Sequence, residues 1–205
     1  MKREYVPVLL LFSSLVAVGI SAIGPYDRLT WFLEVGPVLV GAPILAFTYR
    51  RFPLTNLLYT FLFLHSVILV VGGHYTYAEV PVGNWVRDFF DLSRNHYDRL
   101  GHFAQGFVPA LLAREILKRC SPLGHSRWLP FLVVCVALSF SALYELFEWW
   151  SALVLGESAD QFLGSQGDIW DTQWDMFLAL IGATLCLIVL SKTHDKSLVE
   201  LAKKA

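Results

Sequence analysis

The chain has 205 residues, of which 56% are hydrophobic and 16% charged, and its formal net charge is -1 at pH 7. Its mean hydropathy is +0.54. A composition this apolar excludes an ordinary soluble domain and indicates an integral membrane protein. The nearly neutral charge gives no reason to expect nucleic acid as a partner. Cys120, Cys135 and Cys186 form no C-x-x-C pattern, so neither a disulfide nor thiol chemistry is expected.

Three apolar runs make up the first half of the chain. Residues 6–23 follow Lys2 and Arg3 and are long enough for one bilayer crossing, so we expect a retained helix rather than a cleaved secretory signal. Residues 31–49 and 54–72 are the second and third expected spans. His65 lies inside the third span, where we expect it to be hydrogen-bonded to a neighbouring helix.

The second half begins with the longest polar loop, residues 73–100, whose aromatic side chains suit a membrane interface. This loop could include a short amphipathic helix around Asn84 to Leu92. Three further spans are expected at 101–118, 128–155 and 168–190, with a second polar loop at 156–167 and a charged, helix-compatible tail at 191–205. The prediction is an all-α polytopic membrane protein, a single domain of about six transmembrane helices whose partners are membrane lipids. The sequence does not give its oligomeric state.

The distribution of lysine and arginine predicts the orientation, because short cytoplasmic loops carry the excess of these residues. With the N-terminus inside, the outer side holds four of them: Arg28, Arg87, Arg94 and Arg99. The inner side holds the other twelve: Lys2, Arg3, Arg50, Arg51, Arg114, Lys118, Arg119, Arg127, Lys192, Lys196, Lys203 and Lys204. We therefore expect a bacterial inner (plasma) membrane protein with both termini in the cytoplasm.

In this orientation, ionisable residues from several helix ends meet in one layer at the outer side. Asp98, His102 and Gln105 share a helical face through i, i+4 and i+7 spacing. The expected sixth span would place Asp168, Asp171 and Asp175 on one face by the same rule. The candidate catalytic residues are His102, Glu145, Glu148, Asp168 and Asp171. The remaining candidates for this polar layer are His74, Asp98, Arg99, Gln105, Asp160 and Gln161.

Structural roles are an alternative for each of these residues. Asp168 and Asp171 would also stabilise the positive N-terminal end of a helix, and His102 with Glu145 could simply form an interhelical hydrogen bond. Several unpaired carboxylates at one depth would nevertheless repel one another, so a positive group or shared protons should offset them. The candidates are Arg94, Arg99, His102 and a divalent metal as cofactor. The candidate metal ligands are His102, Glu145, Asp171 and Asp175.

Four strings at these positions resemble the YjdF family of bacterial inner-membrane proteins, a domain of unknown function. They are HYTYAEVP (74–81), NHYDRLGHFAQGFVPAL (95–111), YELFEWW (144–150) and DQFLGSQGDIWDTQWDM (160–176). The string from Asp98 to Phe103 and the acidic residues that follow are more distantly similar to the VanZ-like family, which is linked to glycopeptide-antibiotic tolerance. That family usually has Lys where this chain has Arg99, and Arg where it has Gln166 or Gly167. The resemblance implies membrane topology and a site location, but no reaction.

Three functional classes follow. In the first, the protein is structural or binds lipid, and the polar layer orders the outer loops. In the second, it is a membrane-embedded enzyme that acts on a lipid or lipid-linked envelope molecule, with the His, Glu and Asp residues as acid, base or metal ligands. In the third, it is a small transporter, although no internal repeat and no charge chain through the midplane support this class.

Overall fold

The structure, a computed structural model, describes residues 5–156 and 160–203, and all regular secondary structure in these ranges is helical. Each apolar run predicted from the sequence lies on a long helix. These helices are α1 (Tyr5–Ser21), α2 (Arg28–Thr48), α3 (Asn56–Tyr75), α5 (Tyr97–Cys120), α6 (Leu129–Leu155) and α8 (Asp171–Ala202). Shorter elements connect them: η1 (Tyr77–Glu79), α4 (Pro81–Phe89), η2 (Pro122–His125) and α7 (Asp160–Leu163).

The predicted fold class, an all-α polytopic membrane protein, is confirmed. By length and composition, α2, α3, α6 and α8 can each cross a membrane, and α1 is a shorter apolar helix of 17 residues. α5 carries several charged groups in its first and last turns, among them Asp98 and Arg119. Several boundaries differ from the prediction by a few residues: α2 begins at Arg28 rather than at 31, and α5 at Tyr97 rather than at 101. The largest difference is in α8, which begins at Asp171 rather than at 168 and continues unbroken through most of the tail to Ala202.

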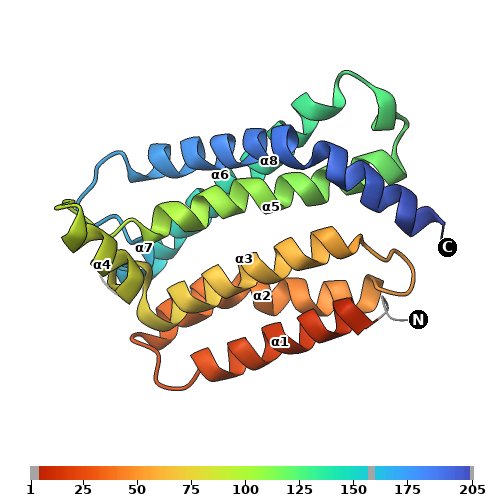
Figure 1. Cartoon of the computed structure of the whole chain (residues 1–205). Coiled ribbons are helices and arrows are strands. Elements are labelled where there is room, and N and C mark those ends of the chain that lie inside the picture. The colour runs from red at the N-terminus through yellow and green to blue at the C-terminus, as the bar shows by residue number, and fades with distance from the viewer. Residues whose placement is uncertain (1–4, 157–159, 204–205) are drawn as a thin grey trace.

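The long helices form two groups of three, as Figure 1 shows. One group contains α1, α2 and α3, the other contains α5, α6 and α8, and α3 packs against α5 to join them. The termini lie at one end of the bundle, and α4 and α7 lie at the other. We call these the terminal end and the α4 end.

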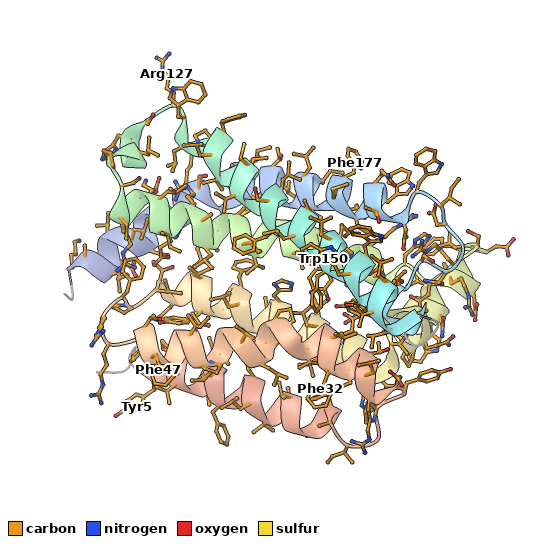
Figure 2. The ribbon with its side chains drawn as sticks, turned by 180° about the vertical axis from the view of Figure 1, so that it is seen from behind. Tyr5, Phe32, Phe47, Arg127, Trp150 and Phe177 are labelled. Atoms are coloured by element: carbon orange, nitrogen blue, oxygen red, sulfur yellow. The ribbon has the colours of Figure 1, made fainter. Side chains whose placement is uncertain are left out.

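Large apolar side chains cover the outside of the bundle. Tyr5, Phe32, Phe47, Trp150 and Phe177 point away from the helices in Figure 2, and Phe47 is 85% exposed. A soluble monomer rarely exposes so many large apolar groups, whereas lipid tails solvate them without cost. The fold therefore packs its helices along narrow seams and leaves the rest of each helix to lipid.

The seam between α5 and α8 is the closest in the bundle, because glycines let the two backbones touch. A Cβ atom at Gly106 would lie 1.9 Å from the carbonyl oxygen of Ala179. A Cβ atom at Gly182 would lie 2.2 Å from the carbonyl oxygen of Phe103. Small residues at such crossings are typical of membrane helix pairs.

We predict that Gly106→Ala and Gly182→Ala each destabilise the protein by about 1–3 kcal/mol, because the added methyl group has no space and must push the two helices apart. Gly36→Ala is the matched control, since nothing lies within 4 Å of a Cβ atom there. In a helix interior, alanine is favoured over glycine by up to about 1 kcal/mol, so this control should be neutral or stabilising. Melting temperatures in detergent test the prediction, and equal effects of all three substitutions would contradict it.

Candidate functional site

His102 is the centre of a buried polar cluster at the α4 end. Its Nε2 atom lies 3.3 Å from Asp98 Oδ1, one turn earlier on α5, and 3.9 Å from Asp175 Oδ2 on α8. Its Nδ1 atom lies 3.5 Å from Glu145 Oε1 on α6. All four side chains are buried. Three helices thus direct a carboxylate at one imidazole, and each carboxylate approaches a defined side of the ring.

Several atoms of this cluster have no hydrogen-bond partner among the described residues. They are His102 Nδ1, Glu145 Oε1 and Asp175 Oδ1. Buried polar atoms are nearly always hydrogen-bonded, and an unpaired one costs about 1–3 kcal/mol. The centre of the cluster therefore contains nitrogen and oxygen atoms that could still accept or donate a hydrogen bond or bind a cation.

Arg94 forms a second part of the cluster, beside the first. It is 6% exposed and forms an ion pair with Asp171 at the start of α8. Its guanidinium also lies 3.6 Å from Asp168 and 3.8 Å from Asp98, and it donates a hydrogen bond to the carbonyl of Gly164. Arg94 therefore holds the loop before α8 against the start of α5.

Arg99 and Gln166 fix the same loop from the surface. Arg99 pairs with Asp168 at 3.0 Å and lies over the ring of Trp174. The Gln166 side chain accepts a hydrogen bond from the backbone N–H of Asn95 and donates one to its carbonyl, at 3.0 and 2.9 Å. Arg99 thus binds an acidic group of this loop, and Gln166 holds the loop against the backbone of Asn95.

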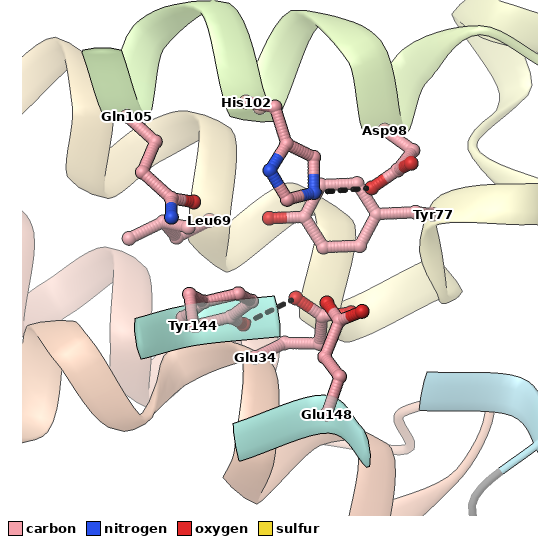
Figure 3. A pocket seen from close by; sticks show the side chains of 9 residues that line it. Glu34, Leu69, Tyr77, Asp98, His102, Gln105, Tyr144 and Glu148 are labelled. Atoms are coloured by element: carbon pink, nitrogen blue, oxygen red, sulfur yellow. Dashed lines mark hydrogen bonds and ion pairs between the residues drawn. The ribbon is translucent and has the colours of Figure 1, made fainter. Parts of the chain in front are cut away.

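A small cavity adjoins the His102 cluster, and Figure 3 shows its lining. The centre of a water molecule can reach about 10 Å³ of it, which is roughly the space that one water needs. Tyr144 Oη donates to Glu34 Oε2 across the cavity at 3.5 Å. The lining consists of Glu34, Leu69, Tyr77, Asp98, Gly101, His102, Gln105, Tyr144 and Glu148.

The structure brings most of the candidate residues together, with some exceptions. His74 is apart from the cluster: its ring bonds the carbonyl of Ser21 at 2.9 Å, which ties α3 to the end of α1. The prediction that Asp168 shares a helical face with Asp171 and Asp175 is wrong, because Asp168 lies in the turn before α8. There its Oδ1 accepts a hydrogen bond from the N–H of Trp170. The side chains of Asp160 and Gln161 lie outside the described part of the chain.

Sequence reasoning missed Glu34, Tyr77 and Tyr144 as lining residues. Glu34 is 3% exposed and stands within the apolar run of α2. An acidic residue inside such a run was a usable signal, because buried carboxylates in membrane helices are costly and seldom incidental. The tyrosines gave no signal, since tyrosine is common at membrane interfaces.

A second buried polar cluster, at the terminal end, was also missed. Glu115 and His194 are both fully buried and lie 2.9 Å apart. Glu115 also accepts hydrogen bonds from both the N–H and the hydroxyl of Thr55, and pairs with Arg119. Arg114 bonds His194 and Asp195 at 2.9 and 2.8 Å. This cluster ties α3, α5 and α8 together, and its carboxylate has several partners.

Negative charge exceeds positive charge at the α4 end. Two arginines, Arg94 and Arg99, face seven carboxylates: Glu34, Asp98, Glu145, Glu148, Asp168, Asp171 and Asp175. His96, in the loop beside them, adds no firm positive charge, because burial and then the charges of Arg99 and Arg94 lower the pKa of its imidazole. The excess favours a bound cation, and Asp98, His102 and Asp175 can each offer one ligand atom, all within 4.8 Å of one another.

We predict that Arg94→Gln destabilises the protein by about 3 kcal/mol, because it leaves Asp171, Asp168 and Asp98 without their shared partner. For a chain of this length that corresponds to a fall in melting temperature of roughly 6–12 °C. Arg87→Gln is the matched control, since among the described residues Arg87 pairs with the exposed Asp88 on the surface of α4 and such pairs contribute little. Similar melting temperatures for the two variants would contradict the structural role assigned to Arg94.

Comparisons with known proteins support the architecture. Residues 6–196 match the family described as "Predicted membrane protein (DUF2238)". Over 204 residues the chain is 53% identical to the inner membrane protein YjdF of Escherichia coli (strain K12), an alignment that covers 97% of this chain and 96% of that protein. No solved structure matches. The resemblance to the YjdF family is thus confirmed, and the chain belongs to the DUF2238 family of multi-pass inner-membrane proteins.

Proposed function

We propose that the protein binds one membrane lipid, with an ammonium-bearing headgroup in the small polar cavity and an acyl chain in a larger apolar cavity. The observation that carries this proposal is the position of Leu69, which lines both cavities. A polar and an apolar compartment that share a wall match the two halves of a lipid molecule.

The apolar cavity lies between the two helix groups. Its volume is about 570 Å³, within the range of roughly 300–1,000 Å³ that ligand pockets occupy. Its walls come from five helices, with residues such as Val38, Leu62 and Pro109. A space of this kind, open along helices that lipid surrounds, suits an acyl chain.

His65 adds one polar group to the apolar cavity. It lines the wall one helical turn from Leu69, and its Nε2 atom has no hydrogen-bond partner in the described part of the chain. Among the described residues, this nitrogen does not make the hydrogen bond to a neighbouring helix that we expected for His65. An ester carbonyl of a bound lipid would lie between headgroup and chain, at the depth where His65 can meet it.

The charge of the polar cavity selects the headgroup. Glu34 and Glu148 line one side of it, with the Tyr144 hydroxyl between α2 and α6. A primary ammonium group is close to water in size, carries a positive charge and has three N–H donors. It fits carboxylates in a water-sized space, whereas a phosphate or a sugar does not.

A transport pathway has less support. Between the polar clusters at the two ends, the seam of α5 and α8 holds Ala110, Leu111, Ala183 and Cys186, none of which is exposed. A polar solute would have to cross this closely packed apolar layer.

The lipid proposal predicts selective stabilisation by phosphatidylethanolamine. When this lipid is added to delipidated protein in detergent at about 100 times its dissociation constant, the gain of about 2.7 kcal/mol should raise the melting temperature by roughly 5 °C or more. Phosphatidylglycerol with the same chains should give a much smaller shift, because its headgroup lacks the ammonium group. Equal shifts with both lipids would overturn the assignment of the headgroup.

Two variants distinguish binding of the lipid headgroup from binding of its acyl chain. Glu148→Gln should reduce the preference for phosphatidylethanolamine, and Leu69→Trp should reduce binding of both lipids by filling the junction of the cavities. Leu64→Trp is the matched control: the same substitution on the same helix, at a side chain that is 48% exposed and lines neither cavity. Lipid binding that responds equally to both tryptophans would contradict the chain site.

We further propose that the α4 end faces the outer side of the inner membrane, because twelve of the sixteen lysines and arginines would then lie on the cytoplasmic side. A reporter that is active only in the cytoplasm should work when fused after Ala205. A periplasmic reporter should work when inserted near Ser158. The reverse pattern would invert the orientation, and with it the leaflet from which the lipid enters.

A further inference from the structure

We propose that Asp98, His102 and Asp175 bind one divalent transition-metal ion, and that Glu145 orients the imidazole of His102 from its other side. This site goes beyond lipid binding. Asp98 and His102 also line the polar cavity, but the metal site requires Asp175 on α8, whereas the proposed headgroup partners, Glu34 and Glu148, lie on α2 and α6.

The spacing of the ligand atoms fits a metal ion. Ligand atoms bound at about 2.1 Å from one ion can be at most about 4.2 Å apart, twice that length. His102 Nε2 lies 3.3 Å from Asp98 Oδ1 and 3.9 Å from Asp175 Oδ2, both below this limit. The three ligand atoms lie within 4.8 Å of one another, so only a small movement of one carboxylate is needed to bring them around one ion.

Asp175 supplies an independent sign of a ligand. It is 2% exposed, and its Oδ1 atom has no hydrogen-bond partner among the described residues. It approaches His102 Nε2 only at 3.9 Å, too far for a hydrogen bond. A carboxyl group buried in this state is either protonated or balanced by a positive charge. A cation between Asp175 and His102 would provide that charge and would occupy the space between the two side chains.

Glu145 has the geometry of a group that supports a metal ligand. It approaches His102 Nδ1, the nitrogen on the opposite side of the ring from Asp98 and Asp175. Metal-bound histidines almost always donate the second ring N–H to a carboxylate or carbonyl, which fixes the tautomer and orients the ring. The gap of 3.5 Å closes to a hydrogen bond with a small rotation of either side chain. Glu145 is therefore a positioning residue.

Two residues of the ligand set expected from the sequence thus take other roles. Glu145 lies on the wrong side of the ring to share an ion with Nε2, and Asp171 forms its ion pair with Arg94. Asp98, which the sequence placed only in the wider polar layer, takes a ligand position instead. One imidazole with two carboxylates suits manganese(II) or zinc(II), because nitrogen ligands favour transition metals and carboxylate oxygens also suit manganese.

The metal also reduces the charge excess of the α4 end. Within the cluster itself, seven carboxylates against two arginines leave a formal excess of five negative charges, and a divalent ion with no other change removes two of them. The ion would lie beside the closest part of the α5–α8 seam, since its ligand His102 is one turn from Gly106. It would thus join the two helices that the glycines bring together.

The test is metal binding to the full-length protein in detergent, first stripped with a chelator. Manganese(II) is titrated while the free ion is measured by electron paramagnetic resonance, and zinc(II) is added as a competitor. We expect about one ion per chain. Asp175→Asn should weaken binding at least about 100-fold, and Glu145→Gln should weaken it by about 10–100-fold, as loss of such a supporting carboxylate does elsewhere.

Asp88→Asn is the control, because Asp88 is an exposed carboxylate on α4 whose ion pair is with Arg87; it should bind as the wild type does. Glu148→Gln should keep the metal and lose the lipid preference, so the two proposals fail separately. If Asp175→Asn does not fold, His102→Gln and the chelator-stripped wild type carry the test. Wild-type protein that binds neither ion, or binding that Asp175→Asn and His102→Gln leave unchanged, would overturn the metal site.

Discussion

The contact of α5 with α8 is the constraint on which the rest of the structure depends. Gly106 and Gly182 let the two backbones touch near the middle of the bundle, and buried polar clusters lie at both ends of the same helix pair. At the α4 end the pair presents His102 and Asp175, and at the terminal end it presents Glu115 and His194. Separating the helices would expose both clusters to lipid, where unpaired polar groups cost several kcal/mol each. The seam and the clusters therefore stabilise one another.

The two clusters differ in a way that separates a structural role from a functional one. At the terminal end, Glu115 has four hydrogen-bonding groups around it from Thr55, Arg119 and His194. At the α4 end, Glu145 and Asp175 each keep a buried oxygen without a partner in the described part of the chain. A satisfied network rigidifies a fold, whereas a partly satisfied one is costly unless something else completes it. The cation and the headgroup proposed above would complete it.

Most of the long helices could be predicted from the sequence because α2, α3, α6 and α8 each contain an apolar run of bilayer length, and that signal needs no tertiary information. The layer of acidic groups could be predicted too, since helical spacing and alternating sidedness place Asp98, Glu145 and Asp171 at one end. The partners of these groups could not be predicted. Nothing in the sequence indicated that Arg94 would pair with Asp171, or that Glu145 would approach Nδ1 of His102 rather than Nε2. Those assignments depend on how α5, α6 and α8 rotate against each other. His194 was missed because the predicted span ended at residue 190, which left His194 in the charged tail. In the structure that tail continues α8.

That continuation has a mechanical consequence. Asp175 and His194 lie 19 residues apart on one uninterrupted helix, a distance of about 28 Å at 1.5 Å per residue. A hydrogen-bonded helix resists stretching along its axis, so a shift of α8 along its axis at one end would also move its side chains at the other. Such a shift at the α4 end would change the position of His194 relative to Glu115 at the terminal end. Helix α8 thus connects the polar cluster at the α4 end to the buried His194–Glu115 hydrogen bond at the terminal end.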